Sequence, residues 1–110
     1  MKVRDFREVP SREEQPGVGL RLVISAEDGA PNFVMRVLEV EPGHSTPRHA
    51  HDWEHEVFIL AGEGAVMSGG GMTPIAVGSV VFVPPNEQHQ FVNSGAGVFR
   101  FICCIPRVDS

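Results

Sequence analysis

The chain has 110 residues, enough for one domain. With 42% hydrophobic and 21% charged residues, its composition is typical of a globular protein and not of a disordered one. The net charge of −5, with no cluster of Lys or Arg, argues against nucleic acid and anionic membranes as partners. The 12 Gly and 9 Pro argue against long helices, because both residues interrupt them.

The N-terminal segment, residues 1–17, is polar and lacks the apolar stretch of a signal peptide. We expect it to form an arm outside the core, and it is a candidate for strand exchange in a dimer. From 18 to 110, short apolar runs alternate with turns rich in Gly and Pro, which predicts one all-β domain, a sandwich or barrel. The expected strands are 18–24, 33–40, 57–61, 65–67, 75–77, 80–83, 91–92 and 98–105.

Two runs, 57–60 and 80–83, are apolar at every position. A strand with one side in water should instead alternate apolar and polar residues. We therefore expect a homodimer that buries the outer face of one sheet. A sheet covered by the chain's own arm is the alternative.

The two cysteines and the longest uncharged stretch indicate in which cellular compartment the protein is expected. Cys103 and Cys104 are adjacent, so on a strand they point to opposite faces and form no ordinary disulfide, which suits a reducing environment. The longest uncharged run, 64–86, is interrupted by Gly and Pro and does not resemble a membrane helix. We expect a cytoplasmic protein that acts on a small molecule.

Four of the five histidines form a candidate metal site. His49, His51 and His55 lie within seven residues, and His89 follows later in the chain. His49 and His51 are two residues apart, so on an extended chain they project from the same face. Imidazole binds Zn, Cu, Fe and Ni well. A chance cluster of surface histidines is the alternative, so the interpretation depends on the residues around them.

Those residues complete two spaced patterns. The first is Gly43, His49, His51, His55 and Gly62, and the second is Gly78, Pro84, Asn86, His89 and Asn93. Both resemble the two motifs of the cupin superfamily, which implies a single-domain cupin barrel, also called a double-stranded β-helix or jelly roll. Asn86 stands where the second motif has glycine. Asn tolerates the left-handed backbone best after Gly, so we expect the turn to survive.

The resemblance also implies a ligand set. Most cupins use a glutamate where this chain has His55, with Glu54 and Glu56 on either side. The spacing to Gly62 favours His55, with Glu56 left as the alternative, so the chain resembles small bacterial four-histidine cupins that bind manganese. The implied ligands of one divalent metal are His49, His51, His55 and His89. Manganese is favoured, with Fe, Cu, Ni and Zn as alternatives, and Glu54 or Glu56 is a candidate partner for a histidine's second nitrogen.

Further residues are candidates for the substrate pocket. Arg36 lies in an otherwise apolar strand and would anchor a carboxylate or phenolate, unless it only reaches the rim of the barrel. Phe91 is expected in the core, but it shares a side with His89, so lining the pocket is the alternative. Phe101 and Cys103 share one face of the last strand, where core packing is the alternative to a pocket role.

We expect a metal-dependent oxidoreductase of the dioxygenase type that acts on a small organic substrate, aromatic or alkenyl. A non-catalytic module that binds or senses a metal or small ligand is the alternative, since the same fold hosts many reactions. Sugar isomerisation is disfavoured, because that chemistry would want a Tyr acid and the chain has no Tyr.

Overall fold

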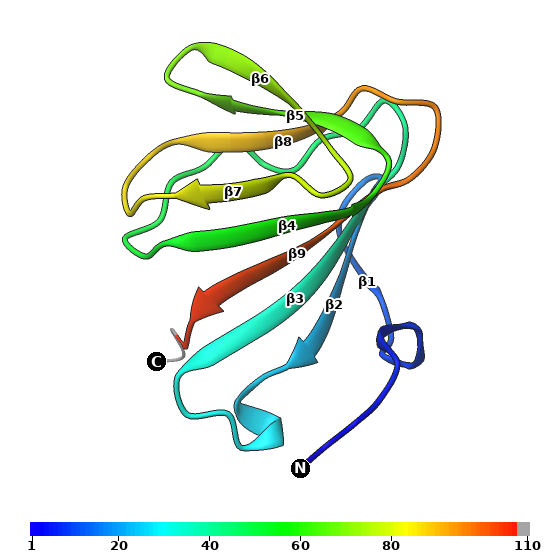
Figure 1. Cartoon of the computed structure of the whole chain (residues 1–110), viewed down its shortest axis with the longest axis vertical. Coiled ribbons are helices and arrows are strands. Elements are labelled where there is room, and N and C mark those ends of the chain that lie inside the picture. The colour runs from blue at the N-terminus through cyan, green and yellow to red at the C-terminus, as the bar shows by residue number, and fades with distance from the viewer. Residues whose placement is uncertain (108–110) are drawn as a thin grey trace.

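Nine strands form two sheets in residues 1–107, the part of the chain that the computed structural model describes (Figure 1). The strands are β1 (Arg12–Gln15), β2 (Val18–Ile24), β3 (Phe33–Val40), β4 (His55–Ala61), β5 (Glu63–Ser68), β6 (Gly71–Ala76), β7 (Val80–Val83), β8 (His89–Asn93) and β9 (Phe99–Pro106). Two short 3-10 turns, η1 (Phe6–Glu8) and η2 (Ala26–Asp28), complete the elements. No described helix is long and apolar enough to cross a membrane.

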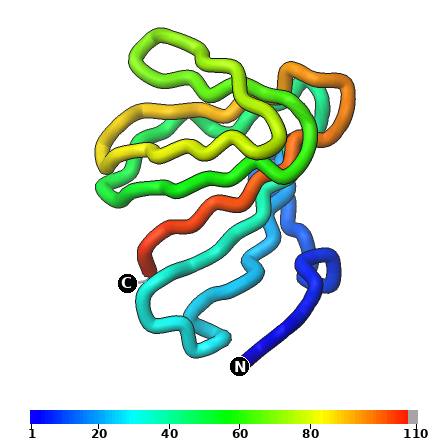
Figure 2. Tube along the Cα trace, viewed as in Figure 1, coloured from blue at the N-terminus to red at the C-terminus, as the bar shows by residue number. Residues whose placement is uncertain are grey.

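The larger sheet has the strand order β1-β2-β3-β9-β4-β7, and the smaller sheet has the order β6-β5-β8. All neighbouring strands are antiparallel. The last strand, β9, lies between β3 and β4, so the middle of the larger sheet is formed by strands that are far apart in the sequence (Figure 2). The all-β fold expected from the sequence is therefore confirmed.

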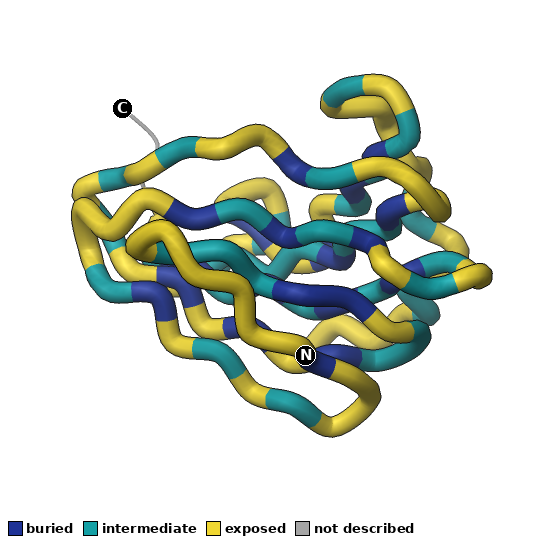
Figure 3. Tube along the Cα trace, turned by 90° about the horizontal axis from the view of Figure 1, so that it is seen from above, coloured by how far each residue is buried: buried dark blue, intermediate teal, exposed yellow. Residues whose placement is uncertain are grey.

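The core lies between the two sheets and is built by the period-two alternation of the strands. In β9, Phe99, Phe101, Cys103 and Ile105 are buried and the residues between them are only half-buried. Across the sheet, Ile59 pairs with Phe101 and is fully buried. Buried positions lie along the strands, while the loops at the periphery are exposed (Figure 3). Burying these side chains supplies the main driving force for the fold.

The outer face of the larger sheet keeps several apolar side chains in water. On β4 and β7, Phe58, Val80 and Phe82 are 45%, 74% and 60% exposed. Phe58 pairs with Val80 across the two strands, so these side chains share one face. β7 is also an edge strand of this sheet. The strands that the sequence shows as apolar on both faces therefore have one face in the core and the other uncovered.

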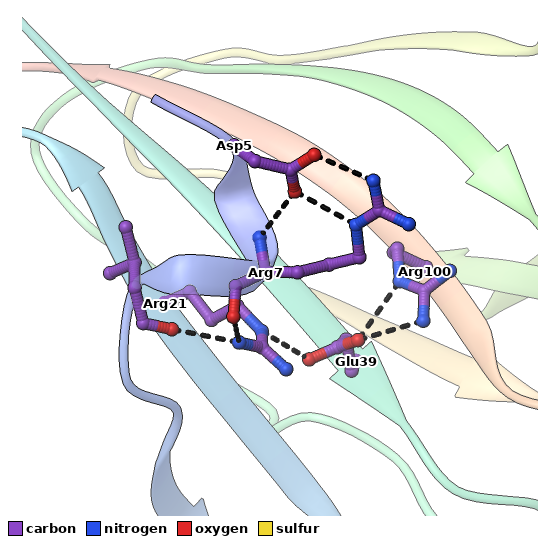
Figure 4. A network of polar contacts seen from close by, with 6 residues as sticks. Asp5, Arg7, Arg21, Glu39 and Arg100 are labelled. Atoms are coloured by element: carbon purple, nitrogen blue, oxygen red, sulfur yellow. Dashed lines mark hydrogen bonds and ion pairs between the residues drawn. The ribbon is translucent and has the colours of Figure 1, made fainter. Parts of the chain in front are cut away.

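The N-terminal arm lies on its own sheet. None of residues 1–17 is buried, as expected for an arm, but β1 within it pairs with β2. Arg21 donates hydrogen bonds to the carbonyls of Arg7 and Val9, at 3.3 and 2.7 Å, and to the carboxylate of Glu39 at 2.8 Å (Figure 4). Arg100 binds the same carboxylate from β9. Burial raises the pKa of Glu39, but these two guanidinium groups outweigh it and the pKa lies below its usual value.

Candidate metal centre

The four histidines come from three parts of the chain. His55 is the first residue of β4 and His89 is the first residue of β8, and these side chains are buried, with 4% and 3% exposed. His49 and His51 lie on the segment that leads into β4 and are half-buried. The strand starts therefore fix two of the rings, and the connecting segment must bring the other two to them.

Backbone hydrogen bonds hold that segment in place. His49 and His89 form an isolated antiparallel bridge, with N···O distances of 3.2 and 2.9 Å. The backbone N–H of Asn86 donates to the carbonyl of His51 at 2.6 Å. Asn86 has a φ of 68°, and it is the one non-glycine residue with positive φ among residues 1–107. The expectation that Asn can replace glycine in this turn is confirmed, and the turn ties the second pattern to the first.

The imidazole rings consequently pack against one another. The centroid distances are 4.4 Å for His49–His51, 4.9 Å for His49–His89, 4.8 Å for His55–His89, 5.4 Å for His51–His55 and 6.4 Å for His51–His89. The fifth histidine, His44, lies in an exposed turn outside this cluster. The structure thus brings together all four histidines that the spacing selected.

The cluster favours neutral imidazole. Burial lowers the pKa of His49 to about 4, and the neighbouring His51 and His89 add to the effect. Burial likewise lowers the pKa of His55 to about 3, with His89 and Arg36 contributing. The pKa of His51 is lowered for the same reasons. Neutral imidazole is the form that donates a lone pair to a metal, so at neutral pH these rings are ready to act as ligands.

Two of the rings have a hydrogen-bond partner at their Nδ1 atom. His55 Nδ1 lies 3.3 Å from the sulfur of Cys103, and His89 Nδ1 lies 3.0 Å from the carbonyl oxygen of Glu87. Glu54 and Glu56, the partners expected from the sequence, do not occupy these places. Glu56 is exposed and pairs with Phe82 and Cys104 on the outer face of the sheet, because adjacent strand residues point to opposite sides.

A small cavity adjoins the cluster. Its volume is about 90 Å³, against roughly 300–1,000 Å³ for the pockets of drug-sized ligands, so it suits a small molecule or one end of a larger one. Exposed Glu14 and Pro47 belong to its lining, so it opens to solvent. The remaining lining residues are Val18, Leu20, Arg36, Leu38, Thr46, His49, His51, His55, His89, Phe91, Phe101 and Cys103.

All four candidate pocket residues line this cavity: Arg36, Phe91, Phe101 and Cys103. Phe101 and Cys103 also belong to the buried core, so the core and pocket interpretations both hold for them. Arg36 points inward from β3, its Nη2 lies 3.0 Å from the sulfur of Cys103, and its buried Nε has no hydrogen-bond partner in the described part of the chain.

Several residues near the site were not expected from the sequence, and Trp53 and Leu38 are two of them. Trp53 stacks on His51 with a centroid distance of 4.3 Å and an interplanar angle of 9°. Leu38 lies two residues after Arg36 on β3 and shares its face, which period-two alternation could have indicated. Trp53 is two residues after His51, but it lies in a turn, where the period-two alternation of strands does not apply.

The side chains suit a divalent transition metal by their chemistry. The donor set is four imidazoles, and the Nε2 of His55 is buried with no hydrogen-bond partner in residues 1–107, which is costly unless this nitrogen finds a partner. However, no group of three or more His, Cys, Asp or Glu side chains in the described residues is arranged so that it could hold a metal ion.

A β-barrel with a histidine cluster beside a small inner cavity defines the class of protein. The family model described as Cupin domain matches residues 36–105, more than half of the chain. The chain belongs to the cupin family. A search of curated proteins found no match.

Solved structures agree with this assignment. The chain is similar to the polyketide cyclase RemF from Streptomyces resistomycificus, at 33% identity and a TM-score of 0.88 over 96% of this chain and 79% of that one. It is also similar to a predicted oxalate decarboxylase from Thermotoga maritima, at 26% identity and a TM-score of 0.82 over 97% of this chain and 100% of that one. A cupin 2 domain-containing protein from Halorhodospira halophila is 28% identical, with a TM-score of 0.77 over 90% of this chain and 75% of that one.

Proposed function

We propose that this cupin is a metal-dependent enzyme that acts on a small, partly apolar organic molecule. The metal would be held by His49, His51, His55 and His89. The observation that carries the proposal is the cluster of four imidazole rings beside an inner cavity, with the unpaired Nε2 of His55 among them.

Manganese is the metal we favour. Four neutral ligands leave the full +2 charge on the ion, so when bound it would act as a Lewis acid toward an oxygen atom of the substrate. A six-coordinate ion would keep two positions free, whereas a tetrahedral Zn²⁺ would be saturated by four histidines. Fe, Cu and Ni also accept imidazole ligands and remain alternatives.

The rest of the cavity orients the substrate. Arg36 would bind an anionic oxygen, a carboxylate or phenolate, since its buried Nε offers an unused donor. Leu38, Phe91 and Phe101 would pack against the apolar part of the substrate and exclude water from it. The side chains thus support a substrate that is charged or enolic at one end and aromatic or alkenyl at the other.

Dioxygenase-type oxidation is the reaction we propose first, with both atoms of O₂ entering the substrate, so that no external reductant is needed. A second candidate is ring closure without oxygen, favoured by the likeness to a polyketide cyclase. That reaction would use the same Arg36 to stabilise an enolate oxygen. A metal or ligand sensor without catalysis is the third possibility, since the cavity alone does not require turnover.

Metal analysis of the untagged protein, followed by oxygen uptake with phenols, flavonols and styrenes, tests the proposal. We expect about one Mn²⁺ per chain and oxygen consumption with at least one of these substrates. Product formation under nitrogen from an enolisable polyketone would favour the cyclase instead. One Zn²⁺ per chain, with neither oxygen uptake nor cyclisation, would favour the non-catalytic sensor. A protein that binds no divalent metal would contradict the proposal.

A further inference from the structure

The sulfur of Cys103 lies between the candidate substrate anchor and one candidate metal ligand. Cys103 is 3% exposed and is paired directly with Arg36 on the neighbouring strand. Its Sγ lies 3.0 Å from Arg36 Nη2 and 3.3 Å from His55 Nδ1. A buried thiol among apolar side chains would need no such partners, so the position of this sulfur calls for an explanation beyond packing.

The chemistry of the three groups decides which atom donates. A guanidinium group has donors only, so the sulfur accepts a hydrogen bond from Arg36. A neutral imidazole carries its proton on one nitrogen and a lone pair on the other. If His55 offers the lone pair of Nε2 to a metal, its proton must be on Nδ1, and the sulfur then accepts a second hydrogen bond from that N–H.

We propose that Cys103 is a positioning residue that fixes the tautomer and orientation of His55. The inference rests on the proposed metal site. Metal-binding histidines usually donate their second N–H to a carboxylate, a carbonyl oxygen or water, and His89 follows this rule through the Glu87 carbonyl. His55 uses a sulfur atom instead. The Nε2 of His55 is buried and unpaired, and the residue lines the cavity, which is the second observation that marks this arrangement as part of a ligand site.

The chain offers a matched pair of cysteines for the test. Cys104 is the next residue, but it faces the outer side of the sheet, opposite Glu56 and Met35. Removing its sulfur leaves the contacts of His55 intact. Cys104→Ala is therefore the control for Cys103→Ala, while Cys103→Ser keeps a hydrogen-bond acceptor of similar size at the inner position.

The first measurement is Mn²⁺ affinity, by titration of metal-free protein. We expect Cys103→Ala to weaken binding by about 10- to 100-fold, the usual effect of losing an outer partner of a metal ligand. Cys103→Ser should recover most of this loss, and Cys104→Ala should bind like the wild type. Equal affinity in wild type and a folded Cys103→Ala, or a Cys103→Ser that binds as weakly as Cys103→Ala, would overturn the positioning role.

The second measurement needs no metal. Nitrogen-15 NMR of the metal-free wild type should show His55 protonated at Nδ1, and Cys103→Ser should keep this tautomer. Protonation at Nε2 in the wild type would refute the inference while leaving the metal site standing. If wild type and Cys104→Ala both bind no divalent metal, the proposed function fails, and the positioning role falls with it.

Discussion

At the scale of single residues, the alternation of one strand decides which side chains face the cavity. His55 faces the cavity from the first position of β4, and the next residue, Glu56, faces water on the other side of the sheet. A shift of one residue in the register would exchange the two. The pairing of His55 with Val83 and of Glu56 with Phe82 fixes that register.

We therefore predict that His55→Ala loses bound metal and that Glu56→Ala retains it. One of four donors disappears in the first variant, so its Mn²⁺ affinity should fall by more than the roughly 10- to 100-fold expected for an outer partner. Metal content after dialysis, measured by elemental analysis, checks this. Metal retained in His55→Ala and lost in Glu56→Ala would show that the glutamate is the ligand.

The spacing of the sequence was sufficient to select the clustered histidines and to expect a left-handed turn at Asn86. It was not sufficient to find the contact of Cys103 with Arg36 and His55, because these residues belong to three strands whose mutual register depends on the whole sheet. The same limit explains why Glu54 or Glu56 was expected as the partner of a histidine: neighbours in the sequence can be read directly, whereas neighbours across strands cannot.

At the scale of elements, apolar runs predicted most of the strands. β2, β3 and β7 have the predicted bounds, and the other predicted strands were found with ends shifted by a few residues. The strand β1 was missed, because its sequence Arg-Glu-Glu-Gln has no apolar pattern and its residues are mostly exposed. These residues form a strand because the edge of β2 presents free backbone N–H and C=O groups to them. Such an edge exists only in the folded sheet, so it cannot be read from the local sequence.

The turn between β4 and β5 depends on Gly62 for two reasons. Its φ is +84°, and a Cβ atom there would lie 2.4 Å from the carbonyl oxygen of Val98. Gly43 has a similar φ of +81°, but a Cβ there would meet nothing within 4 Å. Substituting alanine at each of the two glycines therefore distinguishes the free-energy cost of left-handed backbone alone from that of left-handed backbone with a steric clash.

We predict that Gly43→Ala lowers the free energy of unfolding by about 1–2 kcal/mol, the cost of left-handed backbone for a residue with a Cβ. Gly62→Ala should lower it by clearly more, since the chain near Val98 must also move. Urea unfolding followed by fluorescence of Trp53 measures both. Equal losses in the two variants would mean that the backbone near Val98 yields at little cost.

At the scale of the whole molecule, the part of the outer face of the larger sheet that β4 and β7 form is not covered by any of residues 1–107. Phe58, Val80 and Phe82 lie on it beside an unpaired strand edge. Exposed apolar side chains on an edge strand favour association. The arm covers another part of this sheet, around Glu39 and Arg100, so it does not replace a partner here. The homodimer expected from the sequence stays a prediction, as does exchange of the arm, and this face supports it.

We predict that the wild type has the mass of a dimer in light scattering at micromolar concentration. Val80→Lys should shift it toward monomer, because a charge would be buried at the interface. Val77 is similarly exposed, at 65%, but it lies in the turn before β7. Val77→Lys should therefore leave the dimer intact. A monomeric wild type, or equal dissociation by the two variants, would exclude this face as the dimer interface.

The adjacent cysteines sample two different environments of the same protein. Cys103 is enclosed in the barrel, and Cys104 lies half-buried beside the uncovered apolar face. A thiol-reactive reagent should therefore reach Cys104 at a rate set by whatever covers that face, and Cys103, which is 3% exposed, at a rate set by access through the small inner cavity. The reaction rates of the two neighbouring thiols thus report separately on association at the outer face and on access to the cavity, without any label being engineered into the chain.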